Sequence, residues 1–270
     1  MSSTWGPDLF KGTAWYYARY RAKYPDALFD RIVDRFGLDG TGRLLDLGCG
    51  PGPGAMSIPL ATHFHEVVAM DPRPEMLNEG QRLAAEDGVE NIHWVEVGSG
   101  DLSENLGSFR LVTIGAAFHW MDRQIVLKNF YELMVPKGGV ARVDSGSNAS
   151  EPGEWNRTIQ DVIHRWLGER RRAGDGCYEH PQERYEDIVA RSSFSGPEIW
   201  RHKCLPGIGV DIDGIISNLY STSYCSPTVL GGKKEPFERD LRETLLKLRP
   251  SGEFESSPVT VEAIMALKDG

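Results

Sequence analysis

The first half of the chain alternates short apolar segments with longer segments in which apolar residues recur every three or four positions. Short apolar runs predict strands that are buried on both faces, and the longer pattern predicts amphipathic helices. The expected strands are residues 43–47, 66–71, 92–97, 111–115 and 139–143. The expected helices are residues 26–36, 53–63, 74–86 and 123–133. This order predicts an α/β fold with a doubly wound, mostly parallel sheet and helices on both faces.

The regular alternation ends after a polar loop at residues 145–152. Beyond it we expect helices at residues 154–172, 181–191, 211–220 and 236–248, and strands at residues 198–205 and 259–267. The two late strands complete a seven-stranded sheet, and the late helices form a cover on it. We interpret the chain as one domain with a helical cap at residues 1–42, a core at 43–143, and a cover with C-terminal strands at 144–270.

Composition and charge narrow the class of protein. The chain has 270 residues, enough for one substantial α/β domain. Its formal net charge is −9, and the longest basic run is Arg170-Arg171-Arg172, which we interpret as the polar end of a helix. A phosphate backbone requires clustered Lys and Arg, so we expect no nucleic-acid partner.

The sequence also argues against a membrane, a leader segment and a metal. No apolar stretch approaches the roughly 20 residues that span a bilayer, and the N-terminus lacks the pattern of a signal peptide. The cysteines have neither C-x-x-C nor zinc-ligand spacing: Cys49, Cys177, Cys204 and Cys225. We therefore expect a cytoplasmic protein with reduced thiols and no metal site, and we interpret His63 and His65 as residues of a surface turn.

The most informative segment is a glycine-rich loop after the first predicted strand. Gly48, Gly50 and Gly52 occupy every second position after Asp46. Glycines in such a loop let backbone N–H groups approach a ligand at the carboxyl end of the strand. Asp71 ends the next strand, 21 residues after Gly50, where an acid can accept the hydroxyls of a ribose. The alternative is a plain strand-to-helix turn, with Asp71 merely preceding a proline turn, but the glycines and Asp71 at this spacing, with Asp46 at the end of the first strand, favour a ligand site.

Two nucleotide ligands compete for this loop. Gly50-x-Gly52-x-x-Ala55 matches a dinucleotide fingerprint, so an NAD-dependent oxidoreductase is one hypothesis. Against it, Asp46 would place a like charge beside a pyrophosphate. S-adenosylmethionine carries an ammonium, a sulfonium and a ribose diol without phosphate, and it fits the two acids better. A catalytically silent cofactor-binding protein is a third hypothesis.

The sequence resembles class I S-adenosylmethionine-dependent methyltransferases. It is most similar to the small-molecule branch that includes trans-aconitate and juvenile hormone acid methyltransferases. The segments that carry the resemblance are residues 20–25, 45–52, 70–71, 117–122 and 133–139. The resemblance covers roughly residues 10–145. It implies a Rossmann-like fold, S-adenosyl-L-methionine as cofactor, and in-line methyl transfer to an oxygen or nitrogen of a small metabolite such as a carboxylate, hydroxyl or amine.

The resemblance also implies roles for single residues in cofactor binding. Asp46 and Gly48 would frame the methionine end of the cofactor, with Gly50 in the same loop. Asp71 would hold the ribose hydroxyls. Either Met76 or the turn at Pro72 is expected to flank the adenine.

Three other side chains are assigned to the cofactor, with two departures from the family pattern. Tyr16 is expected to face the sulfonium through a cation–π contact, and Arg21 to pair with the cofactor carboxylate. Ser99 stands near the position where the family often has an acid that reads the adenine amino group, and Asp101 is the alternative. Arg110 replaces the usual Asp before the fourth strand, and we interpret it as a surface change.

The substrate side is expected at residues 116–122, which follow the fourth strand. His119 is the candidate catalytic base, because an imidazole titrates near neutral pH. A purely supporting role in the pocket wall is equally compatible with the sequence, since methyl transfer to a carboxylate needs no base. Trp120 is assigned to the substrate or to the core. Asp122 is expected to cap the next helix.

Residues outside that segment complete the expected substrate site. Tyr20 comes from an aromatic cluster near the N-terminus, most of which we expect to be packing. His202 comes from the predicted cover, which also offers Trp166 and Tyr220 as weaker candidates. The oligomeric state and the acceptor cannot be inferred from these residues.

Overall fold

The fold was analysed in a computed structural model of the chain. It describes residues 6, 8–51, 56–98, 106–146, 153–174, 176–178, 183–204, 209–255 and 258–269.

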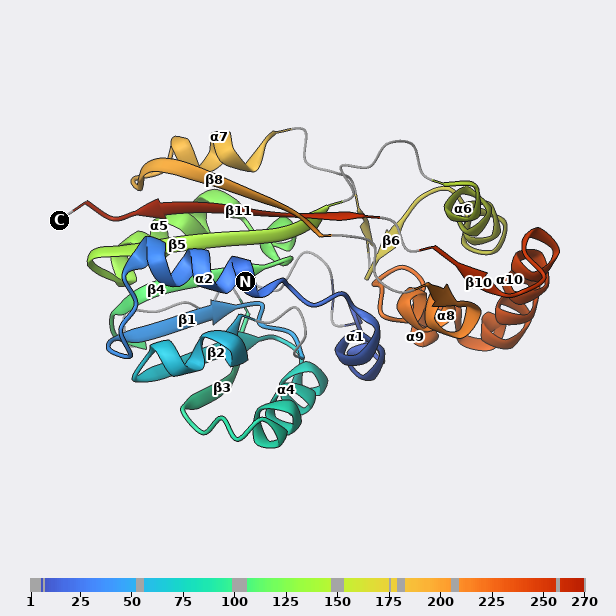
Figure 1. The fold of residues 1–270 in the computed structure, drawn as a ribbon, viewed down its shortest axis with the longest axis horizontal. Helices are drawn as coiled ribbons and strands as arrows, with labels where there is room; N and C mark the ends of the chain where they lie inside the picture. The colour runs from blue at the N-terminus through green and yellow to red at the C-terminus, as the bar shows by residue number, and fades with distance from the viewer. Residues whose placement is uncertain are drawn as a thin grey trace.

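Within the described residues, seven strands form one sheet in the order β3-β2-β1-β4-β5-β11-β8 (Figure 1). The strands are β1 (Arg43–Leu47), β2 (Glu66–Asp71), β3 (Ile92–Glu96), β4 (Phe109–Gly115), β5 (Met134–Gly146), β8 (Ser195–Cys204) and β11 (Val259–Leu267). The strands β3, β2, β1, β4 and β5 are parallel to one another, whereas β11 is antiparallel to both β5 and β8. The predicted seven-stranded, mostly parallel sheet is confirmed.

Helices cover both faces of this sheet. One face carries α2 (Asp26–Phe36), α3 (Ser57–Leu60) and α4 (Pro74–Glu86), and the other carries α5 (Arg123–Leu133) and α7 (Tyr185–Ala190). Leu44 belongs to the core with Leu28 of α2, while its neighbour Leu45 belongs to the core with Phe130 of α5. Successive side chains of a strand point to opposite faces, and burial on both faces explains the continuous apolar sequence of these strands.

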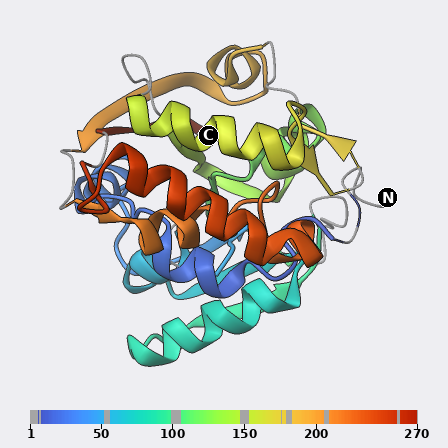
Figure 2. The same cartoon turned by 90° about the vertical axis from the view of Figure 1, so that its right-hand side faces the viewer.

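A cover of helices with its own core lies at one end of the sheet (Figure 1). It contains α6 (Glu154–Leu167), α8 (Ile212–Tyr220), α9 (Pro227–Leu230), the 3₁₀ helix η5 (Gly231–Lys233) and α10 (Lys234–Leu248). Two short strands, β9 (Val210–Asp211) and β10 (Glu253–Phe254), pair beside it. Figure 2 shows α6 and α10 lying side by side on the outer surface. The N-terminal helix α1 (Ala14–Tyr20) contacts both α4 and α8, so it joins the cover to the sheet.

Several predicted boundaries are confirmed and others are wrong. The predicted bounds of α2, β1, β2, α4, α5 and β11 agree with the structure. α6 was expected to reach residue 172, but it ends at Leu167, where Gly168 has a φ of +83°. Arg172 instead begins the hairpin of β6 (Arg172–Ala173) and β7 (Gly176–Cys177). α7 begins at Tyr185 rather than at residue 181, the first residue of the predicted helix.

The helix expected at residues 53–63 is also altered. Its described part begins with α3 at Ser57 and changes to a 3₁₀ helix, η1 (Ala61–His63), two residues after Pro59. Proline lacks the N–H that an α-helix needs, which fits the expected irregularity at this point. Among the helices that the structure describes, none is long and apolar enough to cross a membrane.

Candidate active site

The glycine loop after β1 is held against the end of β2 by backbone hydrogen bonds. The N–H groups of Gly48 and Cys49 donate to the carbonyl of Met70 at 2.8 and 3.0 Å. Gly48 has a φ of +68°, and a Cβ built on it would lie 2.6 Å from Cβ of Ala117. Gly50 has a φ of +58°, but a Cβ there would meet nothing within 4 Å. Gly48 is therefore required for packing, whereas Gly50 borders open space.

Asp71, the last residue of β2, is hydrogen-bonded to this loop. Its Oδ2 accepts a hydrogen bond from the N–H of Gly50 at 3.1 Å, and its Oδ1 accepts one from the N–H of Arg73 at 2.9 Å. Its residue is only 8% exposed. Burial raises the pKa of Asp71 to about 6, and the two N–H donors oppose that shift. Burial therefore disfavours the charged form of Asp71, and this cost is accepted in the folded chain.

Asp46 lies behind the loop and is fully buried. Its Oδ2 accepts hydrogen bonds from the N–H of Met56 at 3.2 Å and from the N–H and hydroxyl of Ser57 at 3.0 and 2.5 Å. Its Oδ1 accepts one from the hydroxyl of Thr113 at 2.9 Å. Burial raises the pKa of Asp46. Asp46 is not among the residues that line the two cavities described below; its hydrogen bonds fix the start of α3 and tie β1 to β4, and its contact with the cofactor stays a prediction.

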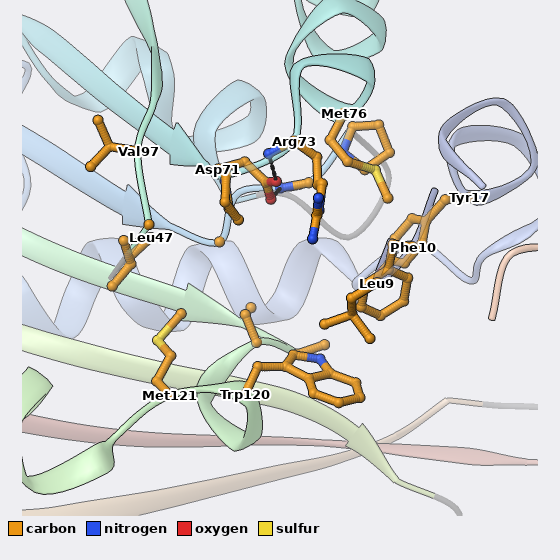
Figure 3. Close-up of a pocket in the computed structure, with 18 residues that line it drawn as sticks. Leu9, Phe10, Tyr17, Leu47, Asp71, Arg73, Met76, Val97, Trp120 and Met121 are labelled. Carbon is orange, nitrogen blue, oxygen red and sulfur yellow. Dashed lines mark hydrogen bonds between the residues drawn. The ribbon is translucent and has the colours of Figure 1, made fainter. Parts of the chain in front are cut away.

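A first cavity opens at the carboxyl ends of β1, β2, β3 and β4 (Figure 3). Asp71, Arg73 and Met76 lie on one side of it, and Trp120 and Met121 lie on the opposite side. Its remaining lining residues include three of the predicted ones, Gly48, Gly50 and Pro72. This edge is where open α/β sheets bind their ligands. Both candidates for the adenine, Met76 and the Pro72 turn, therefore border the cavity.

The segment before and within α1 closes the first cavity. Leu9, Phe10 and Tyr17 point into it (Figure 3). The backbone of this segment is fixed on both sides: the N–H of Gly12 donates to Glu75 of α4 at 2.9 Å. On the other side, the hydroxyl of Thr228 in the cover donates to the carbonyl of residue 11 at 2.9 Å. The predicted N-terminal cap therefore borders the site.

A second cavity adjoins the first and shares Phe10, Tyr17, Ala116 and Trp120 with it. The volumes of the two cavities are about 150 and 290 Å³. Ala116 stands between them with a φ of +49°, an unusual conformation for a residue other than glycine. The second cavity reaches the cover, and its other lining residues include Arg21, Tyr24, His119, Asp144, Arg171, Asn218 and Ser223.

His119 and Trp120 lie where the sequence placed them, in the 3₁₀ helix η4 (Phe118–Trp120) after β4. Their rings are 4.5 Å apart, and Tyr178 approaches both, at 5.4 Å from His119 and 5.2 Å from Trp120. His119 borders the second cavity, and Trp120 borders both. Asp122 caps α5 as predicted, accepting from the N–H of Ile125 at 3.2 Å.

Tyr16 was assigned to the cofactor, but the structure brings the next residue, Tyr17, to the cavities instead. The ring of Tyr16 packs on Tyr220 of the cover at 5.2 Å. Residues four apart share a helix face, so Tyr17 lies on the same side as Arg21, whose guanidinium is 5.1 Å from the Tyr17 ring. The i, i+4 spacing from Arg21 was the signal that could have identified Tyr17.

Other predicted site residues lie away from the cavities. Tyr20 is 37% exposed and packs on Trp15 at 5.9 Å between ring centroids. His202 stacks on Trp200 at 5.5 Å along β8, the edge strand of the sheet, so it is not a residue of either cavity. Ser99 and its alternative, Asp101, fall outside the described residues.

Two weaker candidates belong to the core of the cover. The indole N–H of Trp166 donates to Asp240 at 2.7 Å, and the hydroxyl of Tyr220 donates to Glu238 at 3.0 Å. Arg110 lies at the start of β4, at the opposite end of this strand from the cavities. It pairs with Asp39, in accord with a surface role. Across the described ranges, no group of three His, Cys, Asp or Glu side chains is arranged to hold a metal ion.

Sequence reasoning missed the residues that the N-terminal segment and the cover contribute. Arg171 was interpreted as a helix end, yet it follows α6 and borders the second cavity. Asn218 lies near the end of α8, and Ser223 lies in the turn after it. Asp144 lies near the end of β5. No local pattern marks these residues, because only the tertiary fold brings them to β4.

Comparisons with known proteins agree with this geometry. Residues 44–138 match the model of a family described as a methyltransferase domain. An uncharacterized methyltransferase-like protein of Schizosaccharomyces pombe is 27% identical over 150 residues, which are 56% of this chain and 56% of that protein. A protein of Dictyostelium discoideum described as a candidate methyltransferase is 23% identical over 263 residues, which are 94% of this chain and 91% of that protein.

The length of the relatives and one solved structure complete the comparison. The chain spans about half the length of three S. pombe relatives that it matches. The structure of phosphoethanolamine N-methyltransferase 2 of Haemonchus contortus in complex with S-adenosyl-L-methionine is similar with a TM-score of 0.53 and 18% identity. The similarity covers 96% of this chain and 56% of that chain, and it shows a shared fold.

Proposed function

Because residues 44–138 match the model of a family described as a methyltransferase domain, we propose that this chain transfers a methyl group from S-adenosyl-L-methionine to a small-molecule acceptor. One observation carries the proposal. A buried carboxylate, Asp71, is hydrogen-bonded to the glycine loop and borders a cavity at the carboxyl ends of β1 and β2. A ribose diol supplies the O–H donors that such a carboxylate accepts.

The described residues fit this cofactor. Gly50 borders the first cavity, and open space surrounds the position of its missing Cβ. Met76 and the turn at Pro72 offer an apolar surface for an adenine ring, next to Asp71. Buried acids that accept donors suit a ribose and disfavour a pyrophosphate, because like charges repel in a low dielectric. The known structure of a protein with this fold bound to S-adenosyl-L-methionine supports the same assignment.

Arg21 is the proposed partner of the cofactor's carboxylate. Its Nη2 donates only a long hydrogen bond, 3.5 Å, to the carbonyl of Ser221, and its Nε is buried without a partner among the described residues. Tyr17 lies between Arg21 and the first cavity and presents an aromatic ring to both cavities. An aromatic face attracts a sulfonium cation by about 0.5–2 kcal/mol.

When bound, the cofactor supplies an activated methyl group on a sulfonium. The residues of this chain then hold the acceptor in the second cavity and exclude water. Placement of two reactants supplies about 7–11 kcal/mol of the barrier reduction in favourable cases. His119 borders the second cavity, and we propose that it takes a proton when the acceptor has one to lose, or otherwise supports the wall.

We further propose that the acceptor atom is an oxygen or nitrogen of a small metabolite. The support is the second cavity beside the first, together with the resemblance to the trans-aconitate and juvenile hormone acid methyltransferases. We also propose that residues 1–270 act as one domain, since α1 contacts both the sheet side and the cover.

Methyl transfer can be tested directly. The full chain is incubated with S-adenosyl-L-methionine carrying an isotope label on the methyl group, together with panels of small carboxylates, phenols and amines. Mass spectrometry should detect the labelled methyl on members of one panel, and D71N should lose most of that signal. Full binding of S-adenosylhomocysteine without transfer to any panel would contradict the proposed catalysis.

A further inference from the structure

The second cavity is lined by an arginine, Arg171, that forms no ion pair with a carboxylate among the residues that the structure describes. We infer that this cavity binds an acceptor that carries an anionic group, either a carboxylate or a phosphate, and that Arg171 and Ser223 hold that group. This inference rests on the proposed function, which requires an acceptor next to the first cavity. It adds the charge of the acceptor and the residues that recognise it.

Arg171 is positioned by aromatic rings and not by an acid. Its guanidinium lies 4.4 Å from the ring centroid of Tyr224 and 5.0 Å from that of Tyr178. It forms no ion pair with the residues that the structure describes. Stacking on rings leaves the in-plane N–H groups available, and these match the two oxygens of a carboxylate or phosphate. Among the described residues no acid pairs with Arg171, so its guanidinium is available to an anionic ligand.

Asp144 is the one acid among the described lining residues of this cavity, and other groups engage it. Asp144 borders the same cavity, but it accepts from Nη2 of Arg142 at 2.5 Å and from the N–H of Ser145 at 2.9 Å. Arg142 is buried and also pairs with Glu262. Asp144 is therefore engaged by its own cation, and the lining keeps the positive charge of Arg171.

Ser223 supplies a second, independent observation. The residue is 3% exposed, it lines the second cavity, and its hydroxyl has no hydrogen-bond partner among the described residues. Buried polar groups are normally paired, and an unpaired one is costly. The hydroxyl of Ser223 would donate a hydrogen bond to an anionic oxygen of the bound substrate.

The walls of the cavity suggest what the anionic group is attached to. Tyr17, Tyr24 and Trp120 line the cavity between the glycine loop and the cover. Aromatic side chains pack well against planar apolar groups. The acceptor is therefore an organic acid or phosphate ester with a planar apolar portion.

The test compares ligands that share a ring and differ in charge. Phenylacetate, phenyl phosphate, phenylacetamide and phenethylamine are titrated calorimetrically into the full chain saturated with S-adenosylhomocysteine. We expect at least tenfold tighter binding of phenylacetate or phenyl phosphate than of the neutral amide, and the weakest binding for the amine. The comparison of phenylacetate with phenyl phosphate identifies which anion the site prefers.

Variants then separate the acceptor site from the cofactor site. R171Q should weaken the preferred anionic probe at least tenfold and S223A severalfold, while both keep the affinity for S-adenosylhomocysteine within twofold. R170Q is the matched control. Arg170 is the preceding arginine and does not line the second cavity, so R170Q should bind the anionic probe as tightly as the unaltered chain does.

Two results would overturn the inference. One is equal binding of the acids and the amide, or no binding of either acid, by the saturated protein. The other is a loss of S-adenosylhomocysteine affinity in R171Q, which would assign Arg171 to the cofactor. Because S-adenosylhomocysteine binding is measured in the same titrations, failure of the proposed function is recognised separately, as absence of that binding in the unaltered chain.

Discussion

The backbone N–H of Gly50 donates a 3.1 Å hydrogen bond to Oδ2 of Asp71. This bond joins the loop after β1 to the carboxyl end of β2, so two segments separated by 21 residues form one edge of the first cavity. The same carboxylate that orders the loop also faces the ligand space. Loop geometry and ligand recognition therefore depend on a single acid.

The pH dependence of cofactor binding follows from this acid. Burial raises the pKa of Asp71 to about 6, and ribose hydroxyls bind better to the charged form. We expect the affinity for S-adenosylhomocysteine to fall as the pH is lowered below about 6, by up to about tenfold per pH unit. D71N should bind at least tenfold more weakly at pH 7.5 and lose most of this dependence. Calorimetric titrations from pH 5 to 8 measure both effects.

The raised pKa of Asp71 also makes the free energy of unfolding depend on pH. The folded pKa of Asp71 lies above its unfolded value of 3.8, so the folded chain holds more protons between about pH 4 and 6. The contribution of Asp71 to the free energy of unfolding is therefore largest below pH 4 and decreases as the pH rises through 6. Urea unfolding of the unaltered chain and of D71N should show this difference. A contribution that grows with pH would contradict the assignment.

The two loop glycines should respond differently to alanine. G48A combines a φ of +68° with a contact of 2.6 Å to Ala117, and we expect it to lower the free energy of unfolding by about 3 kcal/mol. G50A meets only the backbone strain, about 1 kcal/mol, but it places a methyl group beside the cavity. It should fold and bind S-adenosylhomocysteine at least tenfold more weakly.

Gly37 provides the control for this pair. It ends α2 with a φ of +55°, has open space around the position of its missing Cβ, and is remote from the cavities. G37A should lose about as much stability as G50A and keep full affinity. Equal affinity of G50A and G37A would show that Gly50 is not beside the ligand.

Asp46 should matter for folding more than for contact with the cofactor. D46A leaves the buried donors of Met56, Ser57 and Thr113 without a partner, which should lower the free energy of unfolding by about 3 kcal/mol. Asp122 is an exposed helix cap, and D122A should cost about 1 kcal/mol. Chemical denaturation compares the two. Similar losses would mean that the Asp46 network contributes little.

His119 can be tested separately from the cofactor. It borders only the second cavity, so H119Q should keep the affinity for S-adenosylhomocysteine within twofold. With an acceptor that must lose a proton, we expect kcat to fall about 100-fold. H202Q is the control, because His202 stacks on Trp200 at the sheet edge. Normal turnover of H119Q with such an acceptor would remove the base role and leave a supporting one.

The sequence predicts the core of this molecule better than its periphery. The strands β1 and β2 are apolar and local, and the glycines and Asp71 follow them directly, so their register and position are encoded within a few residues. Proline at the start of α4 and Gly37 at the end of α2 mark boundaries by backbone chemistry alone.

The rest of the site depends on long-range packing. Tyr16 and Tyr17 are adjacent tyrosines, and only the helix phase, set by contacts of α1 with α4 and α8, decides which one enters the cavity. Arg171 and Ser223 reach the second cavity because the cover packs against the sheet, and no motif in either segment reveals that approach. Long-range packing also places His202 on β8, the edge strand of the sheet, away from both cavities, so its predicted contact with the substrate has no support from the structure.

The central claim is that the loop and Asp71 bind a nucleoside with an amino-acid moiety in place of a dinucleotide. Isothermal titration of the full chain at pH 7.5 with S-adenosylhomocysteine and, separately, with NADH tests it most directly. The account predicts saturable heat with S-adenosylhomocysteine that D71N strongly reduces, and none with NADH. Saturable heat with NADH alone would contradict it.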